Sequence, residues 1–132
     1  MNITAVNHIA IICSDYERSL AFYRDVLGFT LLSEEYRKER QSMMTKLALN
    51  GQYLLELFTF PNSPERPSYP EACGLRHLAF TVDDIVQVVG ELESKGIAHE
   101  PIRISPDGTQ CFFFADPDGL PIEIVQEKPY IL

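Results

Sequence analysis

Two histidines and two glutamates stand in apolar stretches, where ionisable side chains are unusual. His8 and His77 each open a run of aliphatic residues, and Glu56 and Glu123 each lie inside an apolar, strand-like segment. A carboxylate buried there without a partner would lose free energy or take up a proton. The spacing from histidine to glutamate is 48 residues in the first case (8 to 56) and 46 in the second (77 to 123). This near-equal spacing indicates that the four residues belong to one set.

A divalent metal ion is the partner that would make such a set tolerable. Two imidazoles and two carboxylates form a mixed nitrogen and oxygen donor set that suits Ni, Zn, Co, Mn or Fe(II) better than Ca. Four protein ligands would leave octahedral positions for water or substrate, which is the arrangement of a catalytic site. Taken singly, each residue has another explanation. The histidines would be hydrogen-bonded structural residues, and the glutamates would lie at a sheet edge or in a salt bridge.

The four residues belong to two copies of one sequence unit. Residues 8–15 and 77–84 share the order histidine, aliphatic residue, alanine, apolar residues and a polar pair ending in aspartate. Apolar residues at helical spacing follow in both copies, and Gly28 and Gly96 then end the predicted helices. The pattern predicts one strand–helix unit used twice.

Each predicted helix has a start signal and is followed by strands. Ser14 opens a capping box in the first copy, and Asp83 is the corresponding cap in the second. Asn50-Gly51 between alternating apolar runs predicts a hairpin. Each copy therefore reads β-α-β-β-β, and the expected class is α+β with two tandem βαβββ modules.

The 132 residues are enough for one compact domain. We expect a single domain over residues 1–132, with a first module at about 4–60 and a second at about 74–127. A proline-rich connector, 61–73, separates them, and four prolines within its first ten residues exclude a helix or a central strand.

Charge and cysteine content exclude several functions. Eleven Lys and Arg against nineteen Asp and Glu give a net charge of −8, which predicts no nucleic-acid partner and no membrane partner. Cys13, Cys73 and Cys111 are too few and too scattered for a disulfide framework. With neither a signal peptide nor a spanning segment recognised, the expected location is cytoplasmic and the expected partner a small molecule.

Several short motifs resemble the vicinal oxygen chelate superfamily of glyoxalases, bleomycin resistance proteins and dioxygenases. They are His8-Ile-Ala-Ile, Leu27-Gly28-Phe29, Leu55-Glu56-Leu57, Arg76-His77-Leu78-Ala79-Phe80, and Phe114 to Gly119 followed by Ile122-Glu123. Within the superfamily, residues 4–127 are similar to the glyoxalase I (lactoylglutathione lyase) branch, and most of all to a short glyoxalase-like group. The resemblance implies a cup-shaped mixed sheet around one divalent metal ion per site.

The resemblance also implies ligands and a mechanism. His8, Glu56, His77 and Glu123 correspond to the metal ligands, and vicinal oxygens of a small substrate would be chelated. A detaching carboxylate, Glu123 or alternatively Glu56, would carry the proton alpha to the carbonyl in a lyase or isomerase reaction. The alternatives are a non-catalytic protein that sequesters a metabolite or antibiotic, and an Fe(II) dioxygenase. Each site would be intramolecular or shared by a homodimer.

One position departs from the glutathione-dependent pattern. Those enzymes often carry an arginine four residues after the first histidine ligand, whereas this sequence has Ile12. Glutathione dependence is therefore not expected from this position. Arg37, Arg40, Arg76 and Arg103 are candidate substrate-binding residues, because the planar guanidinium pairs with carboxylate or phosphate. The alternative for the first two is a solvated edge or loop.

Overall fold

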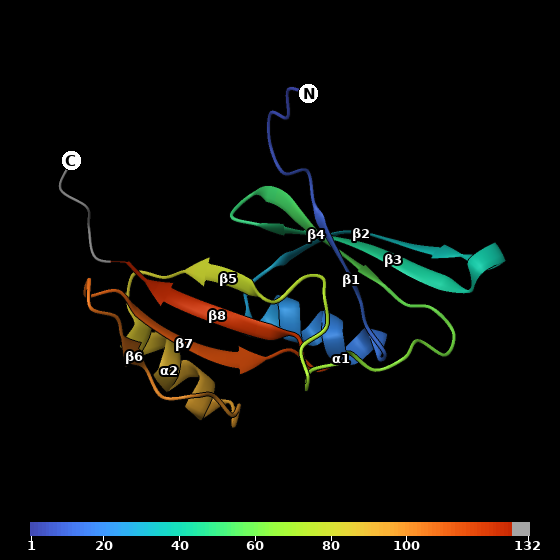
Figure 1. The fold of residues 1–132 in the computed structure, drawn as a ribbon. Helices are drawn as coiled ribbons and strands as arrows, with labels where there is room; N and C mark the ends of the chain where they lie inside the picture. The colour runs from blue at the N-terminus through green and yellow to red at the C-terminus, as the bar shows by residue number, and fades with distance from the viewer. Residues whose placement is uncertain (128–132) are drawn as a thin grey trace. The chain divides into compact units, whose positions relative to one another are not determined.

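The structure, a computed structural model, describes residues 1–127, which form parts of two compact units. The first unit is Met1–Glu65 and the second begins at Arg66, so the division falls within the predicted connector. Each unit contains its own four-stranded sheet (Figure 1). The predicted α+β class is confirmed, whereas the single cup around a shared metal remains a prediction. No helix of the described residues is long and apolar enough to cross a membrane.

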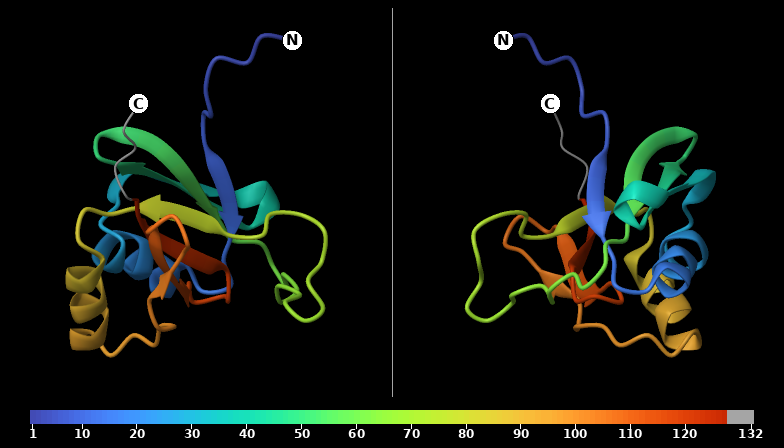
Figure 2. Two further views of the ribbon diagram at one scale, coloured as in Figure 1. Left: turned by 60° about the vertical axis from the view of Figure 1, so that its left-hand side comes forward. Right: turned by 90° about the vertical axis from the view of Figure 1, so that its right-hand side faces the viewer.

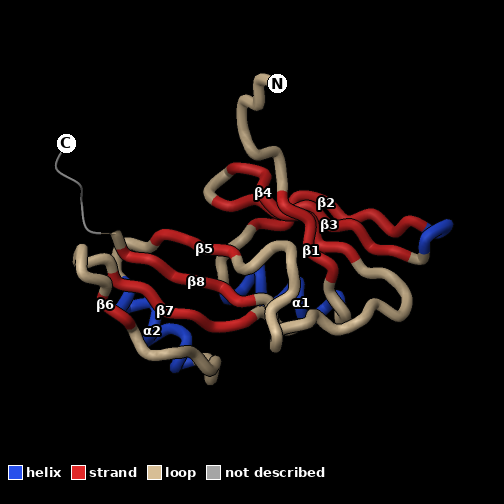
Figure 3. Tube along the Cα trace, viewed as in Figure 1, coloured by secondary structure: helices blue, strands red, loops and turns tan. Residues whose placement is uncertain are grey.

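The first unit has the predicted β-α-β-β-β order. It contains β1 (Ile9–Ile12), α1 (Tyr16–Ala21), the π-helical turn η1 (Phe22–Val26), β2 (Thr30–Arg37), the 3-10 turn η2 (Lys38–Arg40), β3 (Ser42–Leu49) and β4 (Gln52–Phe58). The strand order is β1-β4-β3-β2, with β1 parallel to β4 and the other neighbours antiparallel. β2 and β3 form a long hairpin with η2 at its tip (Figure 3).

The second unit repeats this topology. It contains β5 (Leu78–Thr81), α2 (Ile85–Ser94), β6 (Arg103–Ile104), β7 (Gln110–Ala115) and β8 (Pro121–Gln126). Its order, β5-β8-β7-β6, has the same parallel pair at the same place. Residues 59–77 form neither helix nor strand and run as a long loop from β4 to β5 (Figure 2), as the prolines predict.

Apolar burial separates the two faces of each sheet. Leu47, Leu55 and Leu57 are fully buried in the first unit, where α1 contacts β4, and Phe112 and Ile122 are fully buried in the second, where α2 contacts β8. Because strand residues alternate, the neighbours of these core residues in the strand point to the other face. Glu56 lies on that face in the first unit, and Glu123 lies on it in the second.

Both helices are capped one residue later than the sequence predicted. The caps are Asp15 and Asp84, not Ser14 and Asp83. Both aspartates have extended backbones, and their carboxylates accept hydrogen bonds from backbone N–H groups in the first helical turn at 3.2 and 3.1 Å. A carboxylate at this position also interacts favourably with the helix dipole.

Tyr16 fixes α1 to its sheet. Its hydroxyl donates to Oε1 of Glu34 at 2.5 Å and lies 2.7 Å from the hydroxyl oxygen of Thr45, which is fully buried. Burial and the Glu34 hydrogen bond raise the pKa of Tyr16 to about 12. The neutral phenol therefore links the first turn of α1 to β2 and β3.

Candidate metal centre and ligand pocket

The first unit brings His8 and Glu56 together. Nε2 of His8 lies 3.5 Å from Oε1 of Glu56, whose side chain is only 10% exposed. The parallel pairing of β1 and β4 sets this contact, because Ala10 is opposite Glu56 and His8 precedes Ala10 by two residues on the same face. The register therefore places the imidazole next to the carboxylate.

The His8 ring is held by two neighbours. Nδ1 lies 2.6 Å from Oδ1 of Asn7, and the ring stacks on Tyr53 with 5.4 Å between the ring centres. In the tautomer that donates from Nδ1 to Asn7, Nε2 keeps the lone pair that a metal ion requires. His8 is thus oriented as a ligand on the Glu56 side.

Tyr53 also contacts the carboxylate. Its hydroxyl donates a hydrogen bond to Oε2 of Glu56, and burial together with this bond and the nearby charge raises the pKa of Tyr53 above its usual range. Strict alternation would place residues three apart on opposite faces of a strand. Here the register shifts, since Leu47 faces Leu55 and Ala48 faces Tyr53, so the bulge brings Tyr53 to the Glu56 face. The alternation of side chains along β4 does not by itself predict the contact between Tyr53 and Glu56.

The second unit reproduces the pair at the same register. Ala79 is opposite Glu123 on the parallel strands β5 and β8, and His77 precedes Ala79 by two residues. Nε2 of His77 lies 3.9 Å from Oε2 of Glu123. Phe113 is opposite Glu123 on β7 and packs edge-on against His77 at 5.1 Å between ring centres. Glu123 is 22% exposed, and Leu120 occupies the place that Tyr53 has before Glu56.

Each unit supplies two of the four donors that the predicted metal site needs. Each pair offers one imidazole nitrogen and one carboxylate, which suit a borderline divalent cation. Nδ1 of His77 is buried and has no hydrogen-bond partner among residues 1–127, so a polar atom of this pair is unsatisfied. Over the same residues, no three or more His, Cys, Asp and Glu side chains form a metal-binding group. A four-ligand site therefore requires the pair of one unit to meet the pair of another.

The arginine candidates separate into two groups. Arg37, at the end of β2, lies with its guanidinium carbon 5.7 Å from the centre of the Phe58 ring, and Arg40, in η2, lies 4.9 Å from the Phe60 ring centre. Arg37 is half-buried at the end of the edge strand β2, and Arg40 is exposed in the η2 turn. Both occupy the β2–β3 hairpin of the first unit.

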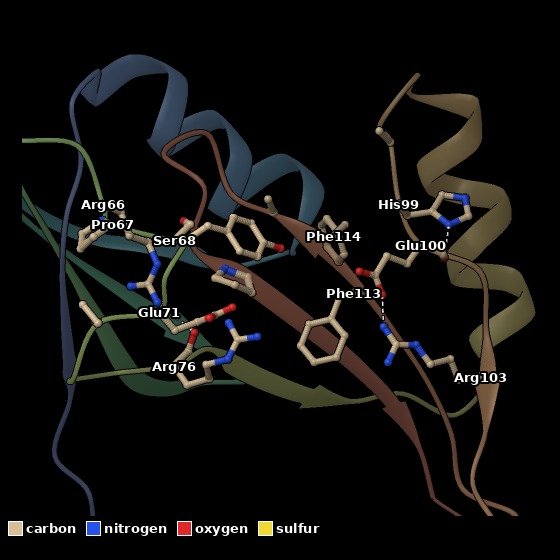
Figure 4. A pocket seen from close by; sticks show the side chains of 15 residues that line it. Arg66, Pro67, Ser68, Glu71, Arg76, His99, Glu100, Arg103, Phe113 and Phe114 are labelled. Carbon is tan, nitrogen blue, oxygen red and sulfur yellow. Dashed lines mark hydrogen bonds and ion pairs between the residues drawn. The ribbon is translucent and has the colours of Figure 1, made fainter.

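Arg76 and Arg103 line one pocket of the second unit, with a volume of about 470 Å³ (Figure 4). Connector residues 66–72 supply one wall of this pocket, which the sequence did not predict. His99 is a further lining residue, and its pKa is raised, chiefly by its hydrogen bond with the Glu100 carbonyl. His99 also pairs with Glu93 at 3.3 Å.

Comparison with known proteins identifies the family. A family model described as the Glyoxalase/Bleomycin resistance protein/Dioxygenase superfamily matches residues 5–124. The chain belongs to this superfamily. The resemblance inferred from the short motifs is thereby confirmed.

Proteins similar to this chain occur in several bacteria. The uncharacterized protein YaeR of Escherichia coli strain K12 is 58% identical over 128 residues, covering 96% of this chain and 99% of YaeR. YwkD of Bacillus subtilis strain 168, also described as uncharacterized, is 54% identical over 128 residues, covering 96% and 100%. The crystal structure of a glyoxalase family protein from Enterococcus faecalis has a TM-score of 0.87 at 43% identity, covering 96% of this chain and 100% of that one.

More distant relatives carry different descriptions. A probable lactoylglutathione lyase of Synechocystis is 26% identical over 121 residues, covering 90% of this chain and 92% of that protein. The structure of TnmS3, an antibiotic binding protein from Streptomyces, has a TM-score of 0.73 at 25% identity, covering 97% and 99%. Proteins similar to this chain are thus described both as a probable enzyme and as a binding protein.

Proposed function

We propose that this protein is a divalent-metal-dependent lyase or isomerase of the glyoxalase I type, acting on a small substrate with vicinal oxygens. The observation that carries the proposal is the equal register of the two pairs. His8 with Glu56 and His77 with Glu123 occupy the same positions on the same parallel strand pair. Members of the superfamily generally bind a divalent metal ion, and these four donors suit one.

The four residues would hold the metal ion, joined within one chain or across a homodimer. When bound, the metal ion supplies a Lewis acid that polarises the substrate's vicinal oxygens. Glu123 is the carboxylate we assign to proton transfer at the carbon next to the carbonyl. Its side chain is more exposed than that of Glu56, and among residues 1–127 no hydroxyl donates to it as that of Tyr53 does to Glu56. Glu56, held by Tyr53, would remain in place.

Metal stoichiometry tests the ligand set. The full chain, purified without an affinity tag, is stripped with a chelator, loaded separately with Ni, Co, Zn, Mn or Fe(II), and analysed for bound metal. We expect one ion per chain in the unaltered protein and loss of that ion in the His77→Ala, Glu123→Ala double variant. His99→Ala, Glu93→Ala is the matched control, since it removes another His–Glu pair of the same unit. Unchanged stoichiometry in the first double variant would contradict the assignment.

Turnover assays test the reaction class. Each metal-loaded form is offered hemithioacetals of several thiols, epimerisable acyl thioesters and catechols. Isomerisation by the unaltered protein, with loss in Glu123→Gln, supports the proposal. Oxygen uptake with catechol would indicate a dioxygenase instead.

A second candidate function is sequestration of a small molecule without turnover. The similarity to TnmS3, described as an antibiotic binding protein, favours it. In that case the metal-loaded protein would bind ligands of the panel in calorimetry while every substrate remained unchanged.

A further inference from the structure

The pocket of the second unit has an unusual charge for this protein. Besides His99, its lining contains three arginines and two glutamates, an excess of one positive charge with His99 neutral, whereas the whole chain carries −8 on the same count. The arginines are Arg66, Arg76 and Arg103, and the glutamates are Glu71 and Glu100. A locally cationic cavity in an acidic protein favours an anionic ligand.

Two of the three arginines already have partners. Arg66 donates from Nη2 to the carbonyl oxygens of Leu75 and Arg76 at 2.9 and 3.0 Å, which fixes the connector against the start of β5. Arg103 forms an ion pair with Glu100, drawn in Figure 4. These two guanidinium groups hold the walls of the pocket.

Arg76 is the remaining cation. Within residues 1–127 its guanidinium forms neither a hydrogen bond nor an ion pair, and Figure 4 shows it in the pocket with Glu71. The planar fork of a guanidinium offers two parallel N–H donors to a carboxylate. Arg76 is therefore the donor available to a bound anion.

The pocket borders the His77–Glu123 pair of the same unit. Phe113 lines the pocket, contacts the ring of His77 and lies opposite Glu123. Arg76 also lines it and directly precedes His77. A ligand that reaches this pair can extend past Phe113 into the cavity.

We propose that the pocket binds a carboxylate group carried by the substrate, with Arg76 as the residue that pairs with it. This inference rests on the proposed function, because it assumes that the vicinal oxygens of the same molecule lie at the His77–Glu123 pair. The substrate class is then a small hydroxyketone or related compound with a monocarboxylate arm.

Charge distinguishes a carboxylate from a phosphate at this place. One excess positive charge balances a monoanion, whereas a dianionic phosphate would leave negative charge uncompensated beside Glu71 and Glu100. The geometry of the guanidinium fork accepts either group. With His99 neutral, the two glutamates therefore favour the carboxylate.

Four probes with one shared head group test the proposal. Hydroxyacetone has no arm, 5-hydroxy-4-oxopentanoate has a carboxylate arm, its primary amide has a neutral arm, and dihydroxyacetone phosphate has a dianionic arm. Each is titrated into the full chain, metal-loaded and chelator-treated, and affinity is measured by NMR chemical-shift changes. We expect the carboxylate to bind about tenfold more tightly than the amide, the difference typical of a charge-assisted hydrogen bond. The phosphate should bind less tightly than the carboxylate.

Variants assign the effect to Arg76. Arg76→Gln should remove the preference for the carboxylate over the amide, and Arg76→Lys should restore part of it because the charge returns without the fork. Arg18→Gln removes an exposed arginine of the first unit and controls for net charge. Equal binding of carboxylate and amide, tighter binding of the phosphate, or loss of the preference in Arg103→Gln but not in Arg76→Gln would each overturn the proposal.

Metal stoichiometry separates this inference from the proposed function. Arg76→Gln should retain one metal ion per chain while it loses the carboxylate preference. If the protein binds no metal but still prefers the carboxylate in an Arg76-dependent manner, the proposed function fails and the pocket assignment stands. Normal metal binding without any carboxylate preference would overturn the pocket assignment and leave the proposed function standing.

Discussion

The hydroxyl of Tyr53 donates a hydrogen bond to Glu56, and the position three residues before Glu123 is Leu120, whose side chain has no donor. The two His–Glu pairs therefore have the same strand register, but among residues 1–127 only the glutamate of the first pair accepts a hydrogen bond from a tyrosine. Glu56 is buried and hydrogen-bonded to Tyr53, whereas Glu123 is more exposed. A mechanism that needs one fixed and one mobile carboxylate matches this difference.

Removing the Tyr53 hydroxyl should destabilise the first unit. Tyr53→Phe keeps the ring that stacks on His8 but leaves an oxygen of Glu56 without its donor, which we expect to lower the free energy of unfolding by about 1–3 kcal/mol. Urea denaturation measures the change. Tyr36→Phe removes an exposed hydroxyl and should change it by less than about 0.5 kcal/mol. Equal stability of the two variants would contradict a structural role for this bond.

Metal addition should stabilise the folded protein through the His–Glu pairs. At a free metal concentration one hundred times the dissociation constant, mass action predicts about 2.7 kcal/mol of added stability. Thermal unfolding of chelator-treated and metal-loaded protein measures the increment. It should disappear in Glu56→Ala, because one carboxylate ligand is lost, and persist in Glu35→Ala, which removes an exposed carboxylate from β2. An increment of the same size in both variants would exclude Glu56 as a ligand.

Adjacent aspartates at the start of α2 should differ sharply. Asp84→Ala removes the carboxylate that accepts from the N–H of Gln87 and should cost about 1 kcal/mol. Asp83→Ala, one residue earlier and exposed, should cost less than about 0.5 kcal/mol. Chemical denaturation of both variants provides the comparison, and a larger cost for Asp83 would reverse the cap assignment.

Tyr16 should make stability fall in alkaline solution. Its pKa is about 12 in the folded protein against an ordinary value of 10.0, chiefly because of burial and then the Glu34 hydrogen bond. A pKa raised by folding contributes stability that is complete below pH 10 and is lost as the pH rises from 10 through about 12. The difference in unfolding free energy between the unaltered protein and Tyr16→Phe should therefore shrink across that window. A difference independent of pH would show that the phenol titrates normally.

The sequence by itself determined the repeated topology and the choice of the four candidate ligands. Helical spacing, strand alternation and the Asn50-Gly51 turn are local signals, and the structure has the β-α-β-β-β order in both units. Duplication of the pattern predicted that the four residues form one set, and the register of the parallel strands places each histidine beside the glutamate of its own unit. The repeated topology follows from short-range preferences that occur in both copies.

Tertiary structure alone decided which further residues surround those pairs. Tyr53 reaches Glu56 because a register shift against β3 changes its face, and pairing between strands is not encoded in the spacing of one strand. Likewise, Arg66 joins the connector to the carbonyls of residues nine and ten positions later, and this link brings the connector to the pocket that Arg76 and Arg103 line. Both contacts depend on distant segments meeting, for which residue type and local periodicity carry no signal.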